Sequence, residues 1–251
     1  MKKLIQKDLK LFFRNRRDIM LSFALPIIFI TLFALVFGKM NNSEEGNLMG
    51  LIHSVAGTSV MMLLFSVAMI GGSLLDEKQE GMLRKLLCAP MHPHYILLGK
   101  MVFANIISII QLIIMFVYAW LVFGLDIMHH IPSLVIMIIA IAYACSGFGV
   151  ILASFAKSRQ QVQGFSTLII MIMSAIGGSM IPLFVMPAFM QNLAVFSVNY
   201  WGIQGIYDIF LKHLPLTDIT FLSRVFVLIG IGTVLNFIAL QMFKKNIFKM
   251  V

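Results

Sequence analysis

The chain has 251 residues, of which 60% are hydrophobic and only 12% are charged, and its formal net charge is +9. Soluble globular domains carry about 25% charged residues, so this composition excludes an ordinary soluble domain and favours a bundle of membrane helices. The basic excess does not indicate nucleic-acid binding, because the Lys and Arg residues are distributed as expected for segments beside a membrane.

Residues 1–18 form a basic N-terminal arm. Its cationic residues recur on one helical stripe and its apolar residues lie on the opposite side: Lys3, Lys7, Lys10, Arg14 and Arg17 against Ile5, Leu9 and Phe12. This periodicity predicts an amphipathic helix that lies on the inner leaflet with its basic face toward the headgroups. The alternative is a plain basic anchor that follows the positive-inside rule.

Six charge-free runs follow the arm. A bilayer core about 30 Å thick requires about 20 apolar residues in a helix. The predicted spans are residues 19–38, 54–75, 101–125, 131–156, 162–182 and 225–243. The sequence therefore predicts an all-α polytopic membrane protein with one transmembrane domain over residues 1–251.

The Lys and Arg residues predict the orientation of these spans. With six crossings, sixteen of the 19 cationic residues fall on one side, and only Lys39, Lys212 and Arg224 fall on the other. Because cytoplasmic loops carry the excess of Lys and Arg, both termini are expected in the cytoplasm. The localisation that follows is the plasma membrane or the bacterial inner membrane.

A short amphipathic helix is predicted at residues 77–90, between spans 2 and 3. Leu83, Leu86 and Leu87 share one helical face, and Pro90 ends the helix. One interpretation is a helix that lies flat on the lipid headgroups. The other is a helix that projects into the cytoplasm and offers its leucines to a partner protein.

The segment after span 5 requires a separate interpretation. No charged residue occurs from Val162 to Tyr207, which is too long for one crossing, and Pro182 and Pro187 interrupt it. Two crossings would place the C-terminus on the wrong side. We therefore expect one crossing followed by a re-entrant segment in the outer leaflet, with Phe196, Tyr200, Trp201 and Tyr207 at the interface.

The sequence offers no catalytic site. It contains no HExxH, GxSxG or CxxC motif, and no GxxxxGK[ST] loop that would bind ATP. The pairs His92/His94 and His129/His130 lie on opposite sides of the membrane and are too sparse for a metal site. We expect no catalytic residue, no metal and no cofactor on this chain. An ion-coupled carrier is also disfavoured, because the centres of the spans hold no Asp, Glu, Lys or Arg.

Residues 76–100 resemble the first cytoplasmic loop of type-2 ATP-binding-cassette (ABC) exporter permeases, in which a pattern close to E-G-x-L-x-x-L-L-x-[ST]-P precedes G-K. The matching residues here are Glu80, Gly81, Leu83, Leu86, Leu87, Pro90, Ile96, Gly99 and Lys100, with Ala89 in place of the usual hydroxyl residue. Four further segments are similar to other parts of the family: KDLKLFFRNRRDIMLSFALPIIF, GFGVILASFAKSRQQVQGFSTLI, GGSMIPLFVMPAFMQ and NYWGIQGI.

The resemblance implies a permease subunit that works as a homodimer or heterodimer with ATPase subunits, which hold ATP and Mg²⁺. The arm would be a connecting helix, and the segment after Pro182 a pair of re-entrant helices. The residues implied to contact the ATPase are Glu80, Gly81, Leu83, Arg84, Leu86, Leu87 and Pro90.

The expected cargo is a hydrophobic or amphipathic compound, such as a drug, an antibiotic or a lipid-like molecule, moved in contact with membrane lipids. Methionine suits adaptable apolar pockets, although most of the 20 methionines are expected to face lipid. The candidate pathway residues are Asn105, Gln111, Phe165, Met171, Met180 and Phe184. The alternative function is a stand-alone secondary carrier or channel driven by an ion gradient.

Overall fold

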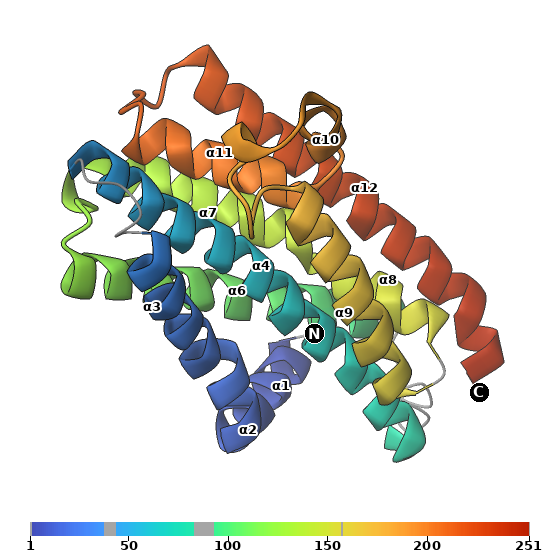
Figure 1. Ribbon diagram of the computed structural model, residues 1–251. Helices are drawn as coiled ribbons and strands as arrows, with labels where there is room; N and C mark the ends of the chain where they lie inside the picture. Colours follow the sequence, from blue (N-terminus) through green and yellow to red (C-terminus); the bar gives the residue numbers. More distant parts are fainter. Residues whose placement is uncertain (1, 38–43, 83–92, 157, 251) are drawn as a thin grey trace.

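The computed structural model describes residues 2–37, 44–82, 93–156 and 158–250, which form a bundle of helices without a strand among them (Figure 1). In chain order the elements are α1 (Lys2–Arg14), α2 (Arg16–Ile19), η1 (Met20–Ala24), α3 (Leu25–Phe37), α4 (Glu44–Gln79), α6 (Pro93–Phe123), η2 (Met128–His130), α7 (Ile131–Ser146), α8 (Phe148–Phe155), α9 (Arg159–Ile176), η3 (Leu183–Val185), α10 (Ala188–Ala194), α11 (Val198–Phe210) and α12 (Ile219–Met250).

Five helical stretches of the described chain are long and apolar enough to cross a membrane, which supports a multi-pass membrane protein. They are Arg16–Phe37, Gly46–Glu77, Tyr95–Phe123, Met128–Phe155 and Ile219–Met242. They correspond to the predicted spans 1, 2, 3, 4 and 6.

The predicted span 162–182 coincides with α9, which is not one of these five. This helix has only 18 residues, begins with Arg159 and two glutamines, and ends at Ile176, six residues before the predicted end. The count of six spans stays a prediction.

Helix α4 is the central element of the bundle, in contact with α3, α6, α7, α8, α9 and α11. It begins ten residues before the predicted start at 54, and the polar side chain of His53, in its third turn, is buried in protein. The Nδ1 atom of His53 lies 2.6 Å from the Tyr207 hydroxyl of α11. The helix also continues to Gln79, into the range of about 77–90 predicted for a coupling helix, and most of that range lies outside the described residues.

Other boundaries also differ from the predicted spans. Helix α6 begins eight residues before residue 101, and α12 begins six residues before residue 225. The predicted span 131–156 is two helices, α7 and α8, with a break at Gly147. Charge-free runs locate the apolar centre of a span, whereas the hydrogen-bonded helix continues into the polar residues beside it.

Helix α1 packs against α6 with a buried face formed by Leu4, Asp8 and Phe12. The ring of Phe12 makes an edge contact with Phe103 of α6, with centroids 6.0 Å apart. The predicted assignment of faces is therefore only partly right. Phe12 points inward as expected, but so does the acidic Asp8, and Lys7 contacts α4 rather than facing only the headgroups.

Helices α10 and α11 occupy the position of the predicted re-entrant segment. Helix α11 is buried between α4, α7 and α12. The expected interfacial position of Tyr207 is wrong, since this side chain is buried against His53. Trp201 is half-buried, donates from Nε1 to the carbonyl oxygen of Val195 at 2.8 Å, and lies beneath the guanidinium of Arg224.

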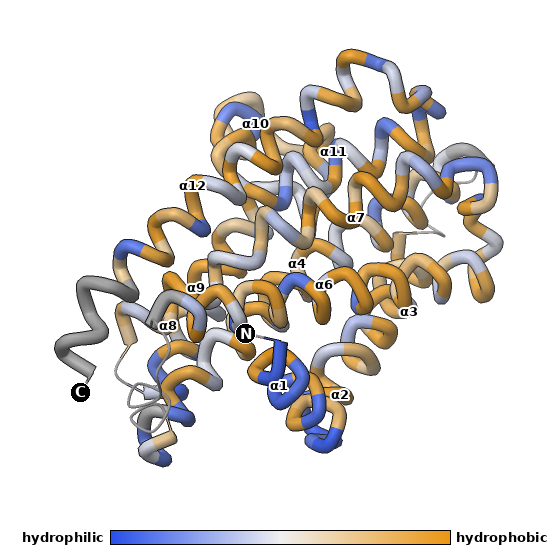
Figure 2. The backbone as a smooth tube through the Cα atoms, turned by 180° about the vertical axis from the view of Figure 1, so that it is seen from behind, coloured by the Kyte–Doolittle hydropathy of each residue, from blue (hydrophilic) through white to orange (hydrophobic). Residues whose placement is uncertain are grey.

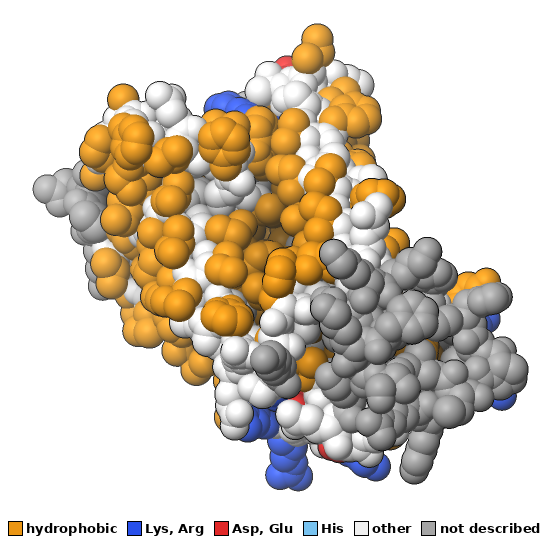
Figure 3. Space-filling view, turned by 90° about the vertical axis from the view of Figure 1, so that its right-hand side faces the viewer, with side chains coloured by type: hydrophobic (Ala, Val, Ile, Leu, Met, Phe, Trp, Pro, Cys, Tyr) orange, Lys and Arg blue, Asp and Glu red, His pale blue; other side chains and the backbone are white. Residues whose placement is uncertain are grey.

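Hydropathy is distributed as expected for a membrane bundle. The long helices are mainly hydrophobic along their middles, while hydrophilic residues gather at α1, α2 and the ends of the bundle (Figure 2). On the face that includes α12, hydrophobic side chains are exposed, and Lys and Arg lie mainly at its lower margin (Figure 3). Within α12, Phe226 and Phe237 are exposed. This arrangement suits contact with lipid along the middle of the bundle.

Candidate functional site

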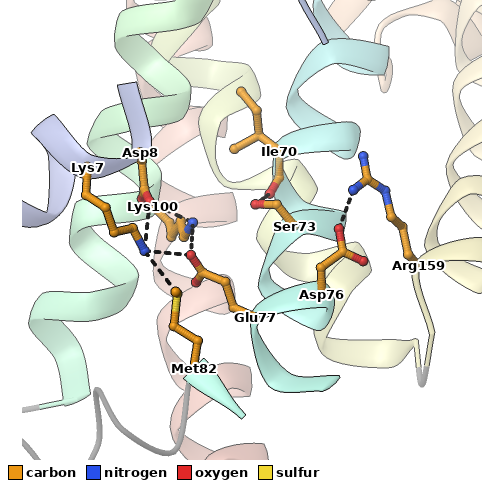
Figure 4. A network of polar contacts seen from close by, with 9 residues as sticks. All are labelled: Lys7, Asp8, Ile70, Ser73, Asp76, Glu77, Met82, Lys100 and Arg159. Atoms are coloured by element: carbon orange, nitrogen blue, oxygen red, sulfur yellow. Dashed lines mark hydrogen bonds and ion pairs between the residues drawn. The ribbon is translucent and has the colours of Figure 1, made fainter. Parts of the chain in front are cut away.

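Four charged side chains from three helices meet at the end of α4 (Figure 4). Lys7 and Asp8 come from α1, Glu77 from α4 and Lys100 from α6. Lys7 Nζ lies 2.8 Å from Glu77 Oε1 and 3.1 Å from Asp8 Oδ1. Lys100 Nζ lies 3.1 Å from both Asp8 Oδ2 and Glu77 Oε1. Signs alternate around the cluster, so each charge faces opposite charges, and we call these four residues the charge cluster.

The charge cluster is largely removed from water. The Lys100 and Asp8 side chains are 4% and 3% exposed, whereas Lys7 is 30% exposed. Burial by itself lowers the pKa of Lys7, but the hydrogen bond and the charge of Glu77 raise that pKa above its ordinary value of 10.5. Breaking a buried pair leaves an uncompensated charge, so the cluster holds α1, α4 and α6 in one register.

A second ion pair joins the same end of α4 to α9. The Arg159 guanidinium at the start of α9 donates to a carboxylate oxygen of Asp76 (Figure 4). Asp76 and Glu77 are consecutive, so their side chains leave α4 about 100° apart. One carboxylate therefore holds α9, and the next holds α1 and α6.

The predicted coupling segment begins directly after these carboxylates. The backbone N–H of Glu80 donates to the carbonyl oxygen of Asp76 at 2.9 Å. Gly81 follows in a turn with a positive φ of 70°, a conformation that favours glycine. Five of the predicted coupling residues lie outside the described residues: Leu83, Arg84, Leu86, Leu87 and Pro90. A displacement of this segment would reach the last turn of α4 through the backbone.

A pocket of about 400 Å³ opens beside the charge cluster. We call it the charged pocket, because most of its polar lining is ionisable. Its lining residues are Asp8, Leu11, Phe12, Arg14, Asn15, Asp18, Met69, Ile70, Ser73, Asp76, Glu77, Glu80, Lys100, Phe103 and Arg159. Five carboxylates thus line it against three cationic side chains.

A second cavity, of about 560 Å³, lies between η1 and α3 on one side and α4 and α9 on the other. We call it the apolar cleft. Its lining residues are Leu21, Leu25, Phe29, Phe33, Met61, Met62, Phe65, Ser66, Met69, Gln163, Ser166, Thr167, Met171 and Met180. The hydroxyls of Ser166 and Thr167 donate to carbonyl oxygens of their own helix, so these two residues add little polarity to the cleft.

Two of the six predicted pathway residues, Met171 and Met180, line the apolar cleft. The other four do not: Phe165, Phe184, Asn105 and Gln111. Phe165 and Phe184 are exposed on α9 and η3. Asn105 lines a separate groove with residues of α7 and α12, and Gln111 is completely buried in α6. The structure thus brings two of the candidates together and leaves four apart from them.

A buried polar junction between the turn after α9 and the start of α11 was not predicted from the sequence. The completely buried Asn199 of α11 donates from Nδ2 to the hydroxyls of Ser174 and Ser179, each at 2.9 Å. Ser197 donates to the carbonyl oxygen of Met173 at 3.0 Å. These bonds fix the turn after α9 against the start of α11.

A buried carboxylate, Asp208, was also missed. It is completely buried in α11, with one oxygen 2.6 Å from Lys212 Nζ and the other 3.5 Å from Arg224 Nε. The spacing of Asp208 and Lys212, four residues apart on a helix, is the sequence signal that could have indicated this pair. The pair with Arg224 joins α11 to α12.

Two comparisons with known proteins found a matching family model and a similar permease. A family model described as ABC-2 type transporter matches residues 1–211. The chain is also 24% identical over 165 residues to the Linearmycin resistance permease protein LnrN of Bacillus subtilis (strain 168). That match covers 65% of this chain and 42% of the relative, so the chain spans less than half the length of the relative it matches. Because the family match extends over most of the described bundle, the chain belongs to the ABC-2 type transporter family.

Proposed function

We propose that this chain is the permease subunit of an ATP-driven exporter of a hydrophobic or amphipathic compound. The observation that carries the proposal is the charge cluster at the base of the segment after Glu80. It ties the end of α4, from which that segment continues, to α1 and α6, and the Asp76–Arg159 pair ties the same end to α9, a wall of the apolar cleft. Movement imposed on the segment from outside would therefore reach the cleft.

The energy would come from a separate ABC ATPase subunit that binds ATP and Mg²⁺. Closure of the ATPase would push the segment at residues 80–90, and α4 and α9 would shift together. Cargo would leave because its affinity for the outward-open arrangement is lower. In this role the ATPase subunit would hydrolyse ATP, and the permease itself would catalyse no reaction.

We also propose the number of spans, their orientation and the subunit composition of the exporter. Helix α9 would be a sixth span, α10 and α11 would re-enter the outer leaflet, and both termini would be cytoplasmic. A second permease subunit, identical or related, would complete the pathway. The described buried charges Asp8, Glu77, Lys100 and Asp208 each face an opposite charge, which supports a structural role for them over ion coupling.

Two measurements test the proposal. Isolated in mild detergent from its native membrane, the chain should bring down an ATPase subunit. Glu80→Ala should preserve this association and folding but reduce cargo transport per ATP hydrolysed. The matched control is Gln79→Ala, because Gln79 is the exposed neighbour in the last turn of α4. Failure of the wild-type chain to associate with any ATPase would contradict the proposal.

A further inference from the structure

The apolar cleft contains two polar side chains that the protein itself does not use. Four hydrophilic residues line the cleft: Ser66 of α4, and Gln163, Ser166 and Thr167 of α9. The hydroxyls of Ser166 and Thr167 donate to carbonyl oxygens of their own helix. The side chains of Ser66 and Gln163 make no hydrogen bond with any described residue. A ligand in the cleft therefore finds two polar groups that are free to bind it.

Ser66 is the more informative of the two, because the residue is only 4% exposed and yet lines the cleft. A serine hydroxyl inside a helix often bonds back to the carbonyl oxygen four residues earlier, as those of Ser54 and Ser154 do here. The Ser66 hydroxyl does not, and its oxygen keeps accessible surface, in contrast to the sealed hydroxyls of Ser59 and Ser108. A buried hydroxyl without a partner is costly, and a ligand group that bonds to it removes this cost.

Gln163 lies on the opposite wall of the cleft, within reach of the same ligand. Helices α4 and α9 run in opposite directions, since the start of α9 is paired with the end of α4. Val162 packs at Gly72, which is six residues from Ser66, or about 9 Å along the helix at 1.5 Å per residue. Gln163 follows Val162, so it lies about 8 Å from Ser66 along the helix axes. An extended ligand would therefore contact both side chains.

The remainder of the cleft is unsuited to a charged group. None of the described residues that line it is charged, and most are methionine, phenylalanine or leucine. Burying a charge among such residues without a partner is very costly. A serine hydroxyl and a glutamine amide each donate and accept a hydrogen bond, and a ligand hydroxyl does the same. The cleft volume of about 560 Å³ suits a small molecule.

We propose that the apolar cleft binds an uncharged apolar compound that carries hydroxyl groups, one held by Ser66 and another by Gln163. The inference rests on the proposed export function and specifies its cargo class. Ser66 and Gln163 would determine specificity, while the methionine and phenylalanine side chains hold the carbon chain. The ligand would bridge α4 and α9, the two helices that the Asp76–Arg159 pair joins at one end.

Photo-labelling of the full chain in phosphatidylcholine nanodiscs, without an ATPase, tests this inference. The probe is a long-chain diol with a diazirine on its carbon chain. The competitors are the unlabelled diol, the mono-alcohol, the alkane and the alkylammonium of one chain length. They are compared at equal concentration in the membrane, which empty nanodiscs calibrate.

The diol should compete about fivefold better than the alcohol, and the alcohol about fivefold better than the alkane, the gain from one net hydrogen bond at each step. The ammonium should compete more weakly than the alcohol, because its charge has no partner in the cleft. The labelled peptides should come from η1, α3, α4 and α9, whose residues line the cleft. This comparison needs no variant.

Two variants locate the hydroxyl contacts. Ser66→Ala should reduce the advantage of the diol over the alkane about fivefold, and Gln163→Leu should do the same. The matched control is Ser166→Ala, because the Ser166 hydroxyl lines the same cleft but is already bonded to its own helix. This control should leave the order of the competitors unchanged. Elution volume and thermal midpoint confirm that each variant is folded.

Equal competition by the diol and the alkane would overturn the inference, because the cleft would then be a site for any acyl chain of the bilayer. Stronger competition by the ammonium than by the alcohol would also overturn it. So would a diol preference that survives Ser66→Ala and Gln163→Leu combined in one folded chain. These results would leave the ATPase association intact. Loss of that association with a normal diol preference would instead contradict only the proposed function.

Discussion

Replacing Lys100 with methionine removes the most enclosed cation of the charge cluster while keeping a side chain of similar shape. In the wild type, Lys100 Nζ lies 3.1 Å from both Asp8 and Glu77, and its side chain is 4% exposed. The change leaves two carboxylates in a buried site with only Lys7 to face them. Removing one partner of a buried pair costs about 3–5 kcal/mol.

The matched variant is Lys7→Met. Lys7 contacts the same two carboxylates, but its side chain is 30% exposed, so water replaces much of the interaction. Exposed pairs contribute about 0.2–1 kcal/mol, and we expect a loss near the upper end of this range. The two variants delete the same charge from the same cluster and differ mainly in burial.

SDS titration of the purified chain in mixed micelles measures the free energy of unfolding of both variants. The free energy of unfolding should fall several times further for Lys100→Met than for Lys7→Met. Adding Asp8→Asn and Glu77→Gln to Lys100→Met should recover most of the Lys100→Met loss, because the one charge of the cluster that then remains, on Lys7, is partly exposed to water. Equal losses for the two lysine variants, or no recovery in the triple variant, would refute the reasoning from burial.

Three further predictions concern packing, the polar junction at Asn199 and pH. Gly71→Ala should cost about 1–3 kcal/mol in the same titration, because the added Cβ would lie 2.1 Å from a backbone oxygen of α8; Gly72→Ala, whose nearest neighbour is 3.5 Å away, should be neutral or stabilising. Asn199→Ala should cost about 1–3 kcal/mol by removing the donor to two buried hydroxyls, and an unchanged free energy would contradict the described junction. The raised pKa of Lys7 predicts that its contribution is fully present below pH 10.5 and is lost as the pH rises through the raised value. The difference in thermal midpoint between wild type and Lys7→Met should therefore stay constant across neutral pH, and a difference that vanished there would be inconsistent with this pair.

The positions of the long helices could be predicted because membrane depth imposes a simple rule on composition. A stretch without charge and of sufficient length must be a helix that crosses or is buried. The rule says nothing about where the helix stops. His53 and Glu77 lie inside α4 because other parts of the protein supply their polar partners. His53 contacts the Tyr207 hydroxyl, and Glu77 contacts two lysine side chains.

The charge cluster could not be predicted from the sequence, because its members, from Lys7 to Lys100, are separated by up to 93 residues. The basic periodicity of the arm predicted which residues share a stripe but not which stripe faces the protein. Asp8 provides the clearest example, since it is the one acidic residue of the basic helix α1 and becomes the partner of Lys100. The negative charge of Asp8 among basic residues was the one feature of the sequence that could have indicated its contact with a lysine.

The lining of the cleft was only partly predictable for a different reason. In a membrane helix, side chains facing lipid and side chains facing an apolar cleft have the same chemistry. Met171 faces the cleft and Phe165 does not, although both are apolar residues of the same helix. Polar residues were no better guides, since Gln111 is completely buried away from the cleft.

Reconstitution of the purified chain into liposomes, with and without its ATPase subunit, tests the source of energy most directly. A fluorescent hydrophobic or amphipathic compound, of the proposed cargo class, reports transport against its concentration gradient. We predict uphill movement only when the ATPase and ATP are both present, and its loss in Glu80→Ala. Uphill movement by the chain alone, powered by an imposed ion gradient, would contradict the account.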